Sequence, residues 1–446
     1  MRHLLTALEK KAIVLSILVA YLGLMSYLLF SKAISSPSDT IIANSPSLKD
    51  VQAAIKKAKI GDTIIVPAGI ARWGSALIID KGIILKAEIP GSVTIINDTP
   101  ITDKDHSFNP ENYVIAYCPK NEKTGQPFRL SGFIVDGGKN RWLFLGKARS
   151  ATMVITQFRV DHCVFQNGYR IPISFRGEIY GVIDNNVIHG STREFAFNKD
   201  TWENLTFNFG TENNRYYEDN VIYTYAGDTA PEGGLGGRYC FRYNTFNHLS
   251  TSGANPWFDM HGNMGPGGNH GTMGAEIYGN VIYCNGKSLT MFDHRGGKLI
   301  AFNNTAYDVK GINGAKAREE YLDSLNPPET NPAGQPQHVC DSYYWNHIAN
   351  GSVIYDYHIS KTVGYEGTVG IVPRWDVHCF KQVENFDGSS GIGVGPLVQR
   401  PVSCTTEGVG WWATDESKLY RWKNGRWELY YTPYTYPHPL RTSLGD

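Results

Sequence analysis

Short apolar and aromatic runs, each followed by a small polar turn, recur along most of the chain. Between residues 238 and 309 the pattern appears three times, as RYCFRYNTF, AEIYGNVIY and KLIAFNNTAY. Three earlier segments, FRVDHCVFQN, IYGVIDNNVIHG and YYEDNVIYTY, share it. In each unit one residue stands directly before the Val or Thr that resumes the strand. These residues are Cys163, Asn186, Asn220, Asn244, Asn280 and Asn304.

The spacing of these positions predicts a coiled repeat. Successive positions lie 23, 34, 24, 36 and 24 residues apart, and a period of roughly 20–50 residues is typical of solenoids. A coil of 23 or 24 residues explains the short intervals. The recurrent Asn predicts a stacked ladder of turns, because Asn tolerates the left-handed conformation and bonds its own turn. The alternative is a β-sandwich in which the similarity arises by chance.

The two longer intervals indicate insertions, at about 195–215 and 250–274. In solenoids, insertions collect on one face, which is often the binding face. We therefore expect a site near these insertions.

A short helix is predicted where the repeats begin. Ser47 is suited to cap its amino end, and Leu48, Val51, Ala54 and Ile55 fall on one face at helical spacing. The helix should end near residue 61. The short strands TIIV, ALIID, GIILKAE and SVTIIN follow, and the segments between them are too short for a crossover helix.

The segment LKDVQAAIKKAKIGDTIIVPAG resembles the amino-terminal cap and first coil of the pectin-lyase-like right-handed parallel β-helix superfamily. The resemblance implies an all-β fold, a single-stranded right-handed parallel β-helix, in which an amphipathic capping helix covers the open end. Such a cap is needed because a bare end would expose apolar core and unpaired strand edges.

The amino terminus carries an uncharged, mostly apolar run over 12–30, preceded by Arg2, Lys10 and Lys11. At about 1.5 Å per residue this run just spans a bilayer core of roughly 30 Å. It predicts either a transmembrane anchor or a signal peptide cut after 31–33. In both cases the rest of the chain is expected to be extracytoplasmic, membrane-anchored or secreted, because the positive charges stay inside.

These observations predict the following organisation: 1–33 anchor or signal peptide, 34–46 linker, 47–310 parallel β-helix, 311–339 irregular insertion, 340–410 final coils, and 411–446 an aromatic hairpin with a carboxyl-terminal tail. In the last segment Lys423, Asn424 and Gly425 signal a hairpin turn. Trp422 and Trp427 would then be cross-strand partners. The hairpin and tail could stack on sugar rings, or they could pack along the solenoid.

Composition argues against a nucleic-acid-binding protein and against a zinc site. Lys+Arg and Asp+Glu both number 42, and nucleic-acid-binding proteins usually carry a basic excess. The seven Cys include no CxxC pair, which argues against a zinc site. Cys163, Cys240 and Cys284 are expected to be buried inside strands.

Titratable residues concentrate around the second insertion. The predicted catalytic set is His261, Glu276, Arg295, Lys298, Asp259, Asp293 and His294. The predicted substrate-binding set is Trp257, Asn263, His270 and Trp202. If the loops share a face, His261, Glu276 and Arg295 meet in one groove, because stacked coils lie about 4.8 Å apart.

This residue set suits the cleavage of an acidic polysaccharide. β-Elimination needs a cation, Arg295 or Lys298, to neutralise the uronate carboxylate, and a base, His261, to take the C5 proton. Hydrolysis would instead need two carboxylates roughly 5–9.5 Å apart. Asp259 and Glu276 are also candidate ligands for Ca²⁺.

Each of these residues also has a structural alternative. The histidine at 261 could cap a turn, Glu276 could form a buried ion pair with Arg295, and residues 293–297 could be a solvated hairpin end. The sequence Met260-His261-Gly262, followed later by Arg295 and Lys298, resembles the Gly-His-Gly turn and Arg-x-Lys of pectin-degrading β-helix hydrolases. Their paired aspartates, and the Arg-x-x-x-x-Arg pattern of calcium-dependent pectate lyases, are not found.

Three hypotheses about function follow. The chain is an exported polysaccharide lyase or hydrolase with a groove at 257–298, with a lyase favoured. Alternatively it is a non-catalytic surface protein that binds glycans or mediates adhesion. The third is an anchored structural element with neither activity.

Overall fold

The computed structural model divides the chain into two units, Met1–Thr40 and Ile41–Asp446. It describes residues 38–98, 108–120, 125–139, 141–150, 152–169, 172–195, 207–225, 231–249, 258–262, 271–312, 315–317, 339, 341–355 and 379–445. The apolar run 12–30 lies outside these residues. Within them, we find no helix that has both the length and the apolar character needed to cross a bilayer.

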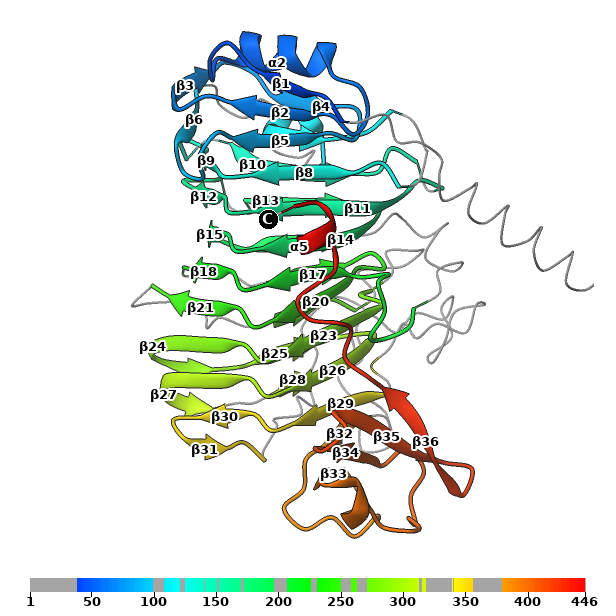
Figure 1. The fold of residues 1–446 in the computed structure, drawn as a ribbon. Coiled ribbons are helices and arrows are strands. Elements are labelled where there is room, and N and C mark those ends of the chain that lie inside the picture. The colour runs from blue at the N-terminus through cyan, green and yellow to red at the C-terminus, as the bar shows by residue number, and fades with distance from the viewer. Residues whose placement is uncertain are drawn as a thin grey trace, which may run out of the picture. The chain divides into compact units, whose positions relative to one another are not determined.

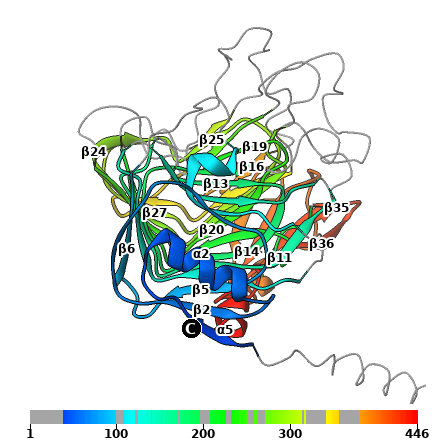
Figure 2. The same ribbon diagram turned by 90° about the horizontal axis from the view of Figure 1, so that it is seen from above.

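The second unit begins with the predicted capping helix, α2 (Leu48–Lys57). Its N-cap is Ser47, whose hydroxyl accepts a hydrogen bond from the backbone N–H of Asp50 at 3.2 Å. The helix buries Val51, Ala54 and Ile55 against the first strands, and Figure 2 shows it lying across the end of the coils. The sequence prediction for this segment is confirmed.

The strands that follow build a right-handed parallel β-helix from three sheets, A, B and C (Figure 1). From β2 to β30 the described strands visit the sheets in the repeating order A, B, C, so each strand pairs with the strand one coil later. Every full coil therefore contributes one strand to each sheet, as the repeat spacing predicts.

The described strands of sheet A are β1 (Thr40–Ile42), β2 (Thr63–Val66), β5 (Ile84–Ala87), β8 (Phe128–Ser131), β11 (Val154–Asp161), β14 (Glu178–Asp184), β17 (Arg215–Glu218), β20 (Arg238–Arg242), β23 (Gly274–Tyr278), β26 (Lys298–Phe302), β29 (Ser342–Trp345) and β32 (Cys379–Lys381). Those of sheet B are β3 (Gly69–Trp73), β6 (Val93–Asn97), β9 (Phe133–Asp136), β12 (Val164–Gln166), β15 (Val187–His189), β18 (Val221–Thr224), β21 (Thr245–His248), β24 (Val281–Leu289), β27 (Thr305–Ile312), β30 (Ile348–Ala349) and β31 (Ser352–Val353). Those of sheet C are β4 (Leu77–Ile79), β7 (Tyr113–Tyr117), β10 (Trp142–Lys147), β13 (Ile173–Arg176), β16 (Thr192–Phe195), β19 (Glu232–Gly234), β22 (Phe258–Met260), β25 (Phe292–His294) and β28 (Ala315–Ala317).

The turn between sheets A and B carries the predicted asparagine ladder. In each step the side-chain oxygen of one Asn accepts hydrogen bonds from the backbone and side-chain N–H groups of the Asn one coil earlier. From Asn220 to Asn244 these bonds are 3.1 and 2.9 Å, and from Asn244 to Asn280 both are 3.0 Å. The left-handed residue is the one before each ladder position, such as Asn185 (φ 55°) and Asn303 (φ 54°).

Side chains that point into the coils form a continuous apolar core. Phe241, Ile277 and Ala301 stack on consecutive strands of sheet A and are all buried there. The thiols of Cys163 and Cys284 lie in the same core, and Cys240 is buried on the opposite face of sheet A. The predicted burial of all three cysteines is confirmed.

The last part of the chain forms a separate four-stranded sheet, sheet D. Its strands are β33 (Ile392–Gly395), β34 (Gly410–Ala413), β35 (Lys418–Lys423) and β36 (Arg426–Tyr431). β35 and β36 form the predicted hairpin, and Trp422 pairs with Trp427 across it. After β36 the tail runs back over sheet A and ends in the short helix α5 (Leu440–Ser443), beside β11 and β14 (Figure 1).

Candidate functional site

A row of charged residues occupies the outer face of sheet C. Arg193, Glu232, Asp259 and Asp293 are successive partners in the parallel register of β16, β19, β22 and β25. Met260, the next residue on β22, lies in the apolar core. Because side chains alternate along a strand, Asp259 and His261 both point outward.

Arg295 connects the ends of two neighbouring coils in this row. Its Nη2 donates hydrogen bonds to both carboxylate oxygens of Asp259, at 2.6 and 2.7 Å, and its Nε donates at 3.1 Å. The same Nη2 lies 2.7 Å from Nε2 of His261. That Nε2 is also 3.2 Å from Oδ2 of Asp259. The sequence prediction that His261 and Arg295 meet is therefore correct.

Sequence reasoning missed two residues that extend this cluster. Arg193 pairs with Glu232 at 3.0 Å, and Oε1 of Glu232 lies 4.0 Å from Nε2 of His261. Glu232 stands one coil before Asp259 and opposite it in the register of sheet C, a relationship that only the folded coils show. We call Arg193, Glu232, Asp259, His261, Asp293 and Arg295 the sheet C cluster.

Charges balance closely within the sheet C cluster. Burial by itself would raise the pKa of the Asp259 carboxyl, but the charges and hydrogen bonds of His261 and Arg295 outweigh burial and hold that pKa below its usual value. Three carboxylates face two guanidinium groups in the cluster, with the imidazole of His261 between them. The side chain of His261 is 17% exposed and is therefore open to a ligand.

Glu276 does not belong to this cluster, so its predicted meeting with His261 and Arg295 is wrong. It lies on β23 of sheet A, with its side chain on the outer face beneath the carboxyl-terminal part. Its carboxylate accepts from the backbone N–H of Gly210 at 2.9 Å and from Tyr431 Oη at 2.8 Å. Burial raises the pKa of this carboxyl. The predicted buried ion pair with Arg295 is also wrong.

His294 and Lys298 are likewise separated from the outer face of sheet C. His294 is the neighbour of Asp293 on β25 and is fully buried, with Nδ1 2.5 Å from the hydroxyl of Tyr344. Burial lowers its pKa to about 4. Lys298 begins β26 of sheet A and pairs with Asp341 at 3.5 Å. Asp293 stays in the cluster, with Oδ2 3.7 Å from Nε of Arg295.

The four predicted substrate-binding residues, Trp202, Trp257, Asn263 and His270, lie outside the described residues. Among the described residues no group of three or more His, Cys, Asp and Glu side chains is placed to hold a metal ion. Asp259 and Glu276, the predicted Ca²⁺ ligands, stand on different sheets with separate partners.

Comparisons with known proteins identify no family. No family model matches the chain, and no curated protein matches it. Among solved structures, an alginate lyase from Paenibacillus sp. str. FPU-7 is 12% identical with a TM-score of 0.36, over 61% of this chain and 97% of that one. A mutant of the PL6 family alginate lyase AlyGC is 14% identical with a TM-score of 0.41, over 91% of this chain and 58% of that one.

A Family 28 exopolygalacturonase from Yersinia enterocolitica is 12% identical with a TM-score of 0.29, over 73% of this chain and 68% of that one. TM-scores below 0.5 describe partial superposition.

Proposed function

We propose that this chain binds an acidic polysaccharide at the sheet C cluster and cleaves it by β-elimination. The observation that carries the proposal is the contact of Arg295 with Nε2 of the partly exposed His261. It places a cation and a candidate base side by side on an outer face. The apolar run 12–30 supports a location outside the cytoplasm, where such polymers occur.

Arg295 supplies the carboxylate clamp. Its guanidinium binds the uronate carboxylate and neutralises the charge that builds up when the C5 proton leaves. Arginine suits this role because its planar fork binds carboxylates in a bidentate manner. The substrate carboxylate competes with Asp259 for the guanidinium and frees Nε2 of His261.

His261 is the base. Nε2 takes the C5 proton, the C4–O bond breaks, a C4=C5 double bond forms, and water protonates the departing oxygen. Asp259 is a positioning residue, because its Oδ2 lies 3.2 Å from Nε2. It accepts a hydrogen bond from the new N–H and stabilises the imidazolium.

A glycan-binding surface without cleavage is the second candidate. It is favoured by the pairing of both arginines with carboxylates, Arg193 with Glu232 and Arg295 with Asp259. Each guanidinium would stay partly bonded to its own carboxylate when a uronate binds. Its contact with the uronate would then be weak, which suits reversible binding better than catalysis.

The test is to incubate the purified full-length chain with a panel of uronate polysaccharides, with added Ca²⁺ and with a chelator. The unsaturated product is followed by its ultraviolet absorbance, and new reducing ends are assayed in parallel. We expect absorbance to rise, and the rise to be lost in His261→Ala and Arg295→Gln but kept in Arg426→Gln, which changes an exposed arginine of the hairpin. Reducing ends without absorbance would indicate hydrolysis by the carboxylates of the cluster. Binding without either product would establish the second candidate.

A further inference from the structure

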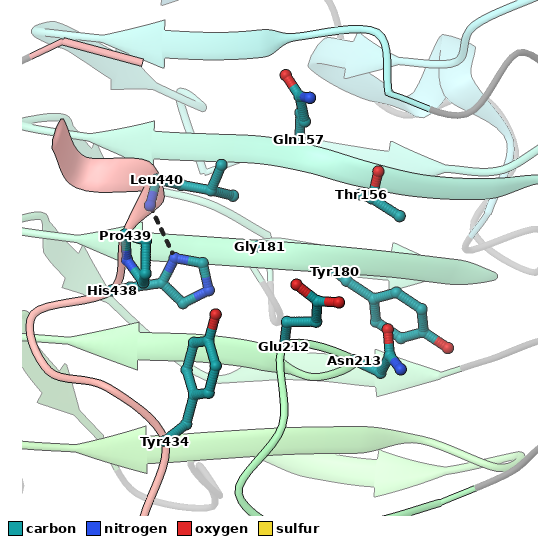
Figure 3. Close-up of a pocket in the computed structure, with 10 residues that line it drawn as sticks. All are labelled: Thr156, Gln157, Tyr180, Gly181, Glu212, Asn213, Tyr434, His438, Pro439 and Leu440. Carbon is teal, nitrogen blue, oxygen red and sulfur yellow. Dashed lines mark hydrogen bonds between the residues drawn. The ribbon is translucent and has the colours of Figure 1, made fainter. Parts of the chain in front are cut away.

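A pocket lies on a different face from the sheet C cluster, between the outer face of sheet A and the carboxyl-terminal tail (Figure 3). Its volume is about 340 Å³, within the range of roughly 300–1,000 Å³ found for small-molecule sites. Four segments of the chain line it. Their polar contributions are Thr156 and Gln157 from β11, Tyr180 from β14, Glu212 and Asn213 from the segment before β17, and Tyr434 and His438 from the tail.

The pocket coincides with a break in the register of sheet A. The pairing of β11 with β14 shifts between Ile155 and Phe158, so Thr156 and Gln157 have no partners in that register. Opposite the shift, Gly181 approaches so closely that a Cβ there would lie 2.0 Å from the carbonyl oxygen of Phe158. β-Bulges commonly redirect side chains beside binding sites.

His438 presents a buried donor to this pocket. The residue is 4% exposed, and its Nδ1 accepts a hydrogen bond from the backbone N–H of Leu440 at 3.2 Å. Burial, together with nearby arginines, lowers its pKa to about 3, so the neutral imidazole carries its proton on Nε2. Within the described part of the chain this Nε2 has no hydrogen-bond partner. A buried donor without an acceptor is destabilising, and a bound ligand oxygen would satisfy it.

The other polar groups that line the pocket determine which charge and which hydrogen-bonding groups a ligand can carry. In Figure 3 the carboxylate of Glu212 and the hydroxyl of Tyr434 point toward the same space as the ring of His438. The described residues that line the pocket include one carboxylate and no Lys or Arg. Glu212 accepts hydrogen bonds from hydroxyl groups and repels anions, while the amides of Gln157 and Asn213 both donate and accept. The ring of Tyr434 adds an apolar surface.

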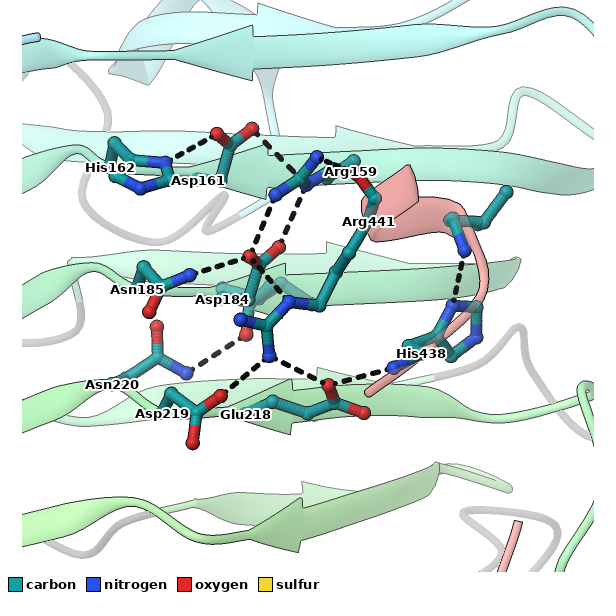
Figure 4. Close-up of polar contacts among 12 residues, drawn as sticks. Arg159, Asp161, His162, Asp184, Asn185, Glu218, Asp219, Asn220, His438 and Arg441 are labelled. Carbon is teal, nitrogen blue, oxygen red and sulfur yellow. Dashed lines mark hydrogen bonds and ion pairs between the residues drawn. The ribbon is translucent and has the colours of Figure 1, made fainter. Parts of the chain in front are cut away.

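The carboxyl-terminal tail, which forms one wall of the pocket, is held against sheet A by ion pairs (Figure 4). Arg441 pairs with Asp184 at 3.3 Å, with Glu218 at 3.3 Å and with Asp219 at 2.5 Å. Arg159 donates to the carbonyl oxygen of Arg441 at 2.6 Å. The wall is therefore formed before any ligand arrives, which lowers the entropic cost of binding.

We propose that this pocket is a binding site for a neutral hexose unit, with Nε2–H of His438 donating to a sugar oxygen and Glu212 accepting from sugar hydroxyls. The site is separate from the sheet C cluster and does not depend on the function proposed for that cluster. It gives the protein a second contact with a polysaccharide, selective for uncharged sugars.

Binding is measured by saturation-transfer NMR and titration of the full-length chain with the methyl glycosides of glucose, galactose and mannose, and with glucuronate. At least one neutral glycoside should bind, and glucuronate should bind roughly tenfold more weakly because Glu212 repels its carboxylate. Glu212→Gln should weaken neutral sugar binding roughly tenfold, because charge-assisted hydrogen bonds are lost. Glu88→Gln is the matched control, since Glu88 is exposed and far along the chain from the pocket.

His438→Asn tests the buried donor. The Asn side-chain oxygen can still accept from the N–H two residues on, so the tail turn is kept while the Nε2–H donor is removed. Unchanged thermal unfolding with weakened sugar binding supports the proposal. The proposal is overturned if no neutral glycoside binds, or if Glu212→Gln and His438→Asn both bind sugar as the wild type does. It is also overturned if the pocket binds only amines and Glu212→Gln abolishes amine binding. Arg295→Gln should leave this binding unchanged, which separates the outcome from that of the sheet C cluster.

Discussion

Nη2 of Arg295 lies 2.7 Å from Nε2 of His261, although 34 positions separate the two residues in the chain. β22 and β25 are adjacent strands in parallel register, with Asp259 opposite Asp293. His261 and Arg295, which each follow one of these aspartates by two positions, therefore lie beside one another. The contact follows from the stacking of coils, whatever the length of the segment between them.

Replacing Asp259 with Asn should lower kcat/KM for uronate polymers by about tenfold or more, because Arg295 and His261 lose the anion that orients both. The acid limb of the pH–rate profile should also move to lower pH, since a nearby negative charge no longer favours the protonated imidazole. The measurement is kcat/KM against pH. Asp98→Asn, in an exposed pair with Arg72, is the control. A loss of rate with an unmoved acid limb would refute the positioning role.

Replacing Glu276 with Ala should destabilise the fold by about 3 kcal/mol, because it leaves buried donors of Gly210, Asn214 and Tyr431 without their acceptor. Chemical denaturation measures the change, with the half-buried Glu428 of the hairpin replaced by Ala for comparison. Activity per folded molecule should not change. A stable but inactive variant would return Glu276 to the catalytic residues.

Replacing Asn244 with Ala should cost about 2–4 kcal/mol, because one side chain serves both the preceding and the following rung of the ladder. Hydrogen exchange should accelerate at the turns around Asn220 and Asn280 before it does elsewhere. The exposed Asn385 is a suitable site for the control substitution to Ala. Equal effects from the two substitutions would show that the ladder contributes little.

Stability should fall as the pH drops from about 6.5 toward 4. Burial lowers the pKa of His294 to about 4 and those of His347 and His438 to about 3, against an ordinary value of 6.5. Over this window the unfolded chain binds protons that the folded chain does not, so each histidine contributes a slope of about 1.4 kcal/mol per pH unit.

Urea denaturation at stepped pH measures this slope. His438→Asn should remove one histidine's share of it while leaving the rest. A stability that stays constant between pH 6.5 and 5 would contradict the assignment of these three imidazoles as neutral and buried.

The sequence by itself determined the features that depend on short-range pattern. Ser47 and the apolar face after it specify the capping helix, and Lys423, Asn424 and Gly425 specify the hairpin. The asparagine ladder was readable because each rung repeats the same local turn. These features can be predicted from the sequence because the residues that define them are neighbours along the chain.

The tertiary structure alone decided which charged residues share a face. Asp293 and His294 are adjacent, yet one points out of the coil and the other into it, since side chains alternate along a strand. Glu276 and Asp259 are close in sequence but lie on different sheets, because an intervening turn carries the chain around the coil. The position of a residue along its strand decides whether its side chain points into or out of the coil, and the length of the preceding turn decides which sheet it joins. Both are fixed by a register that forms only when the coils stack.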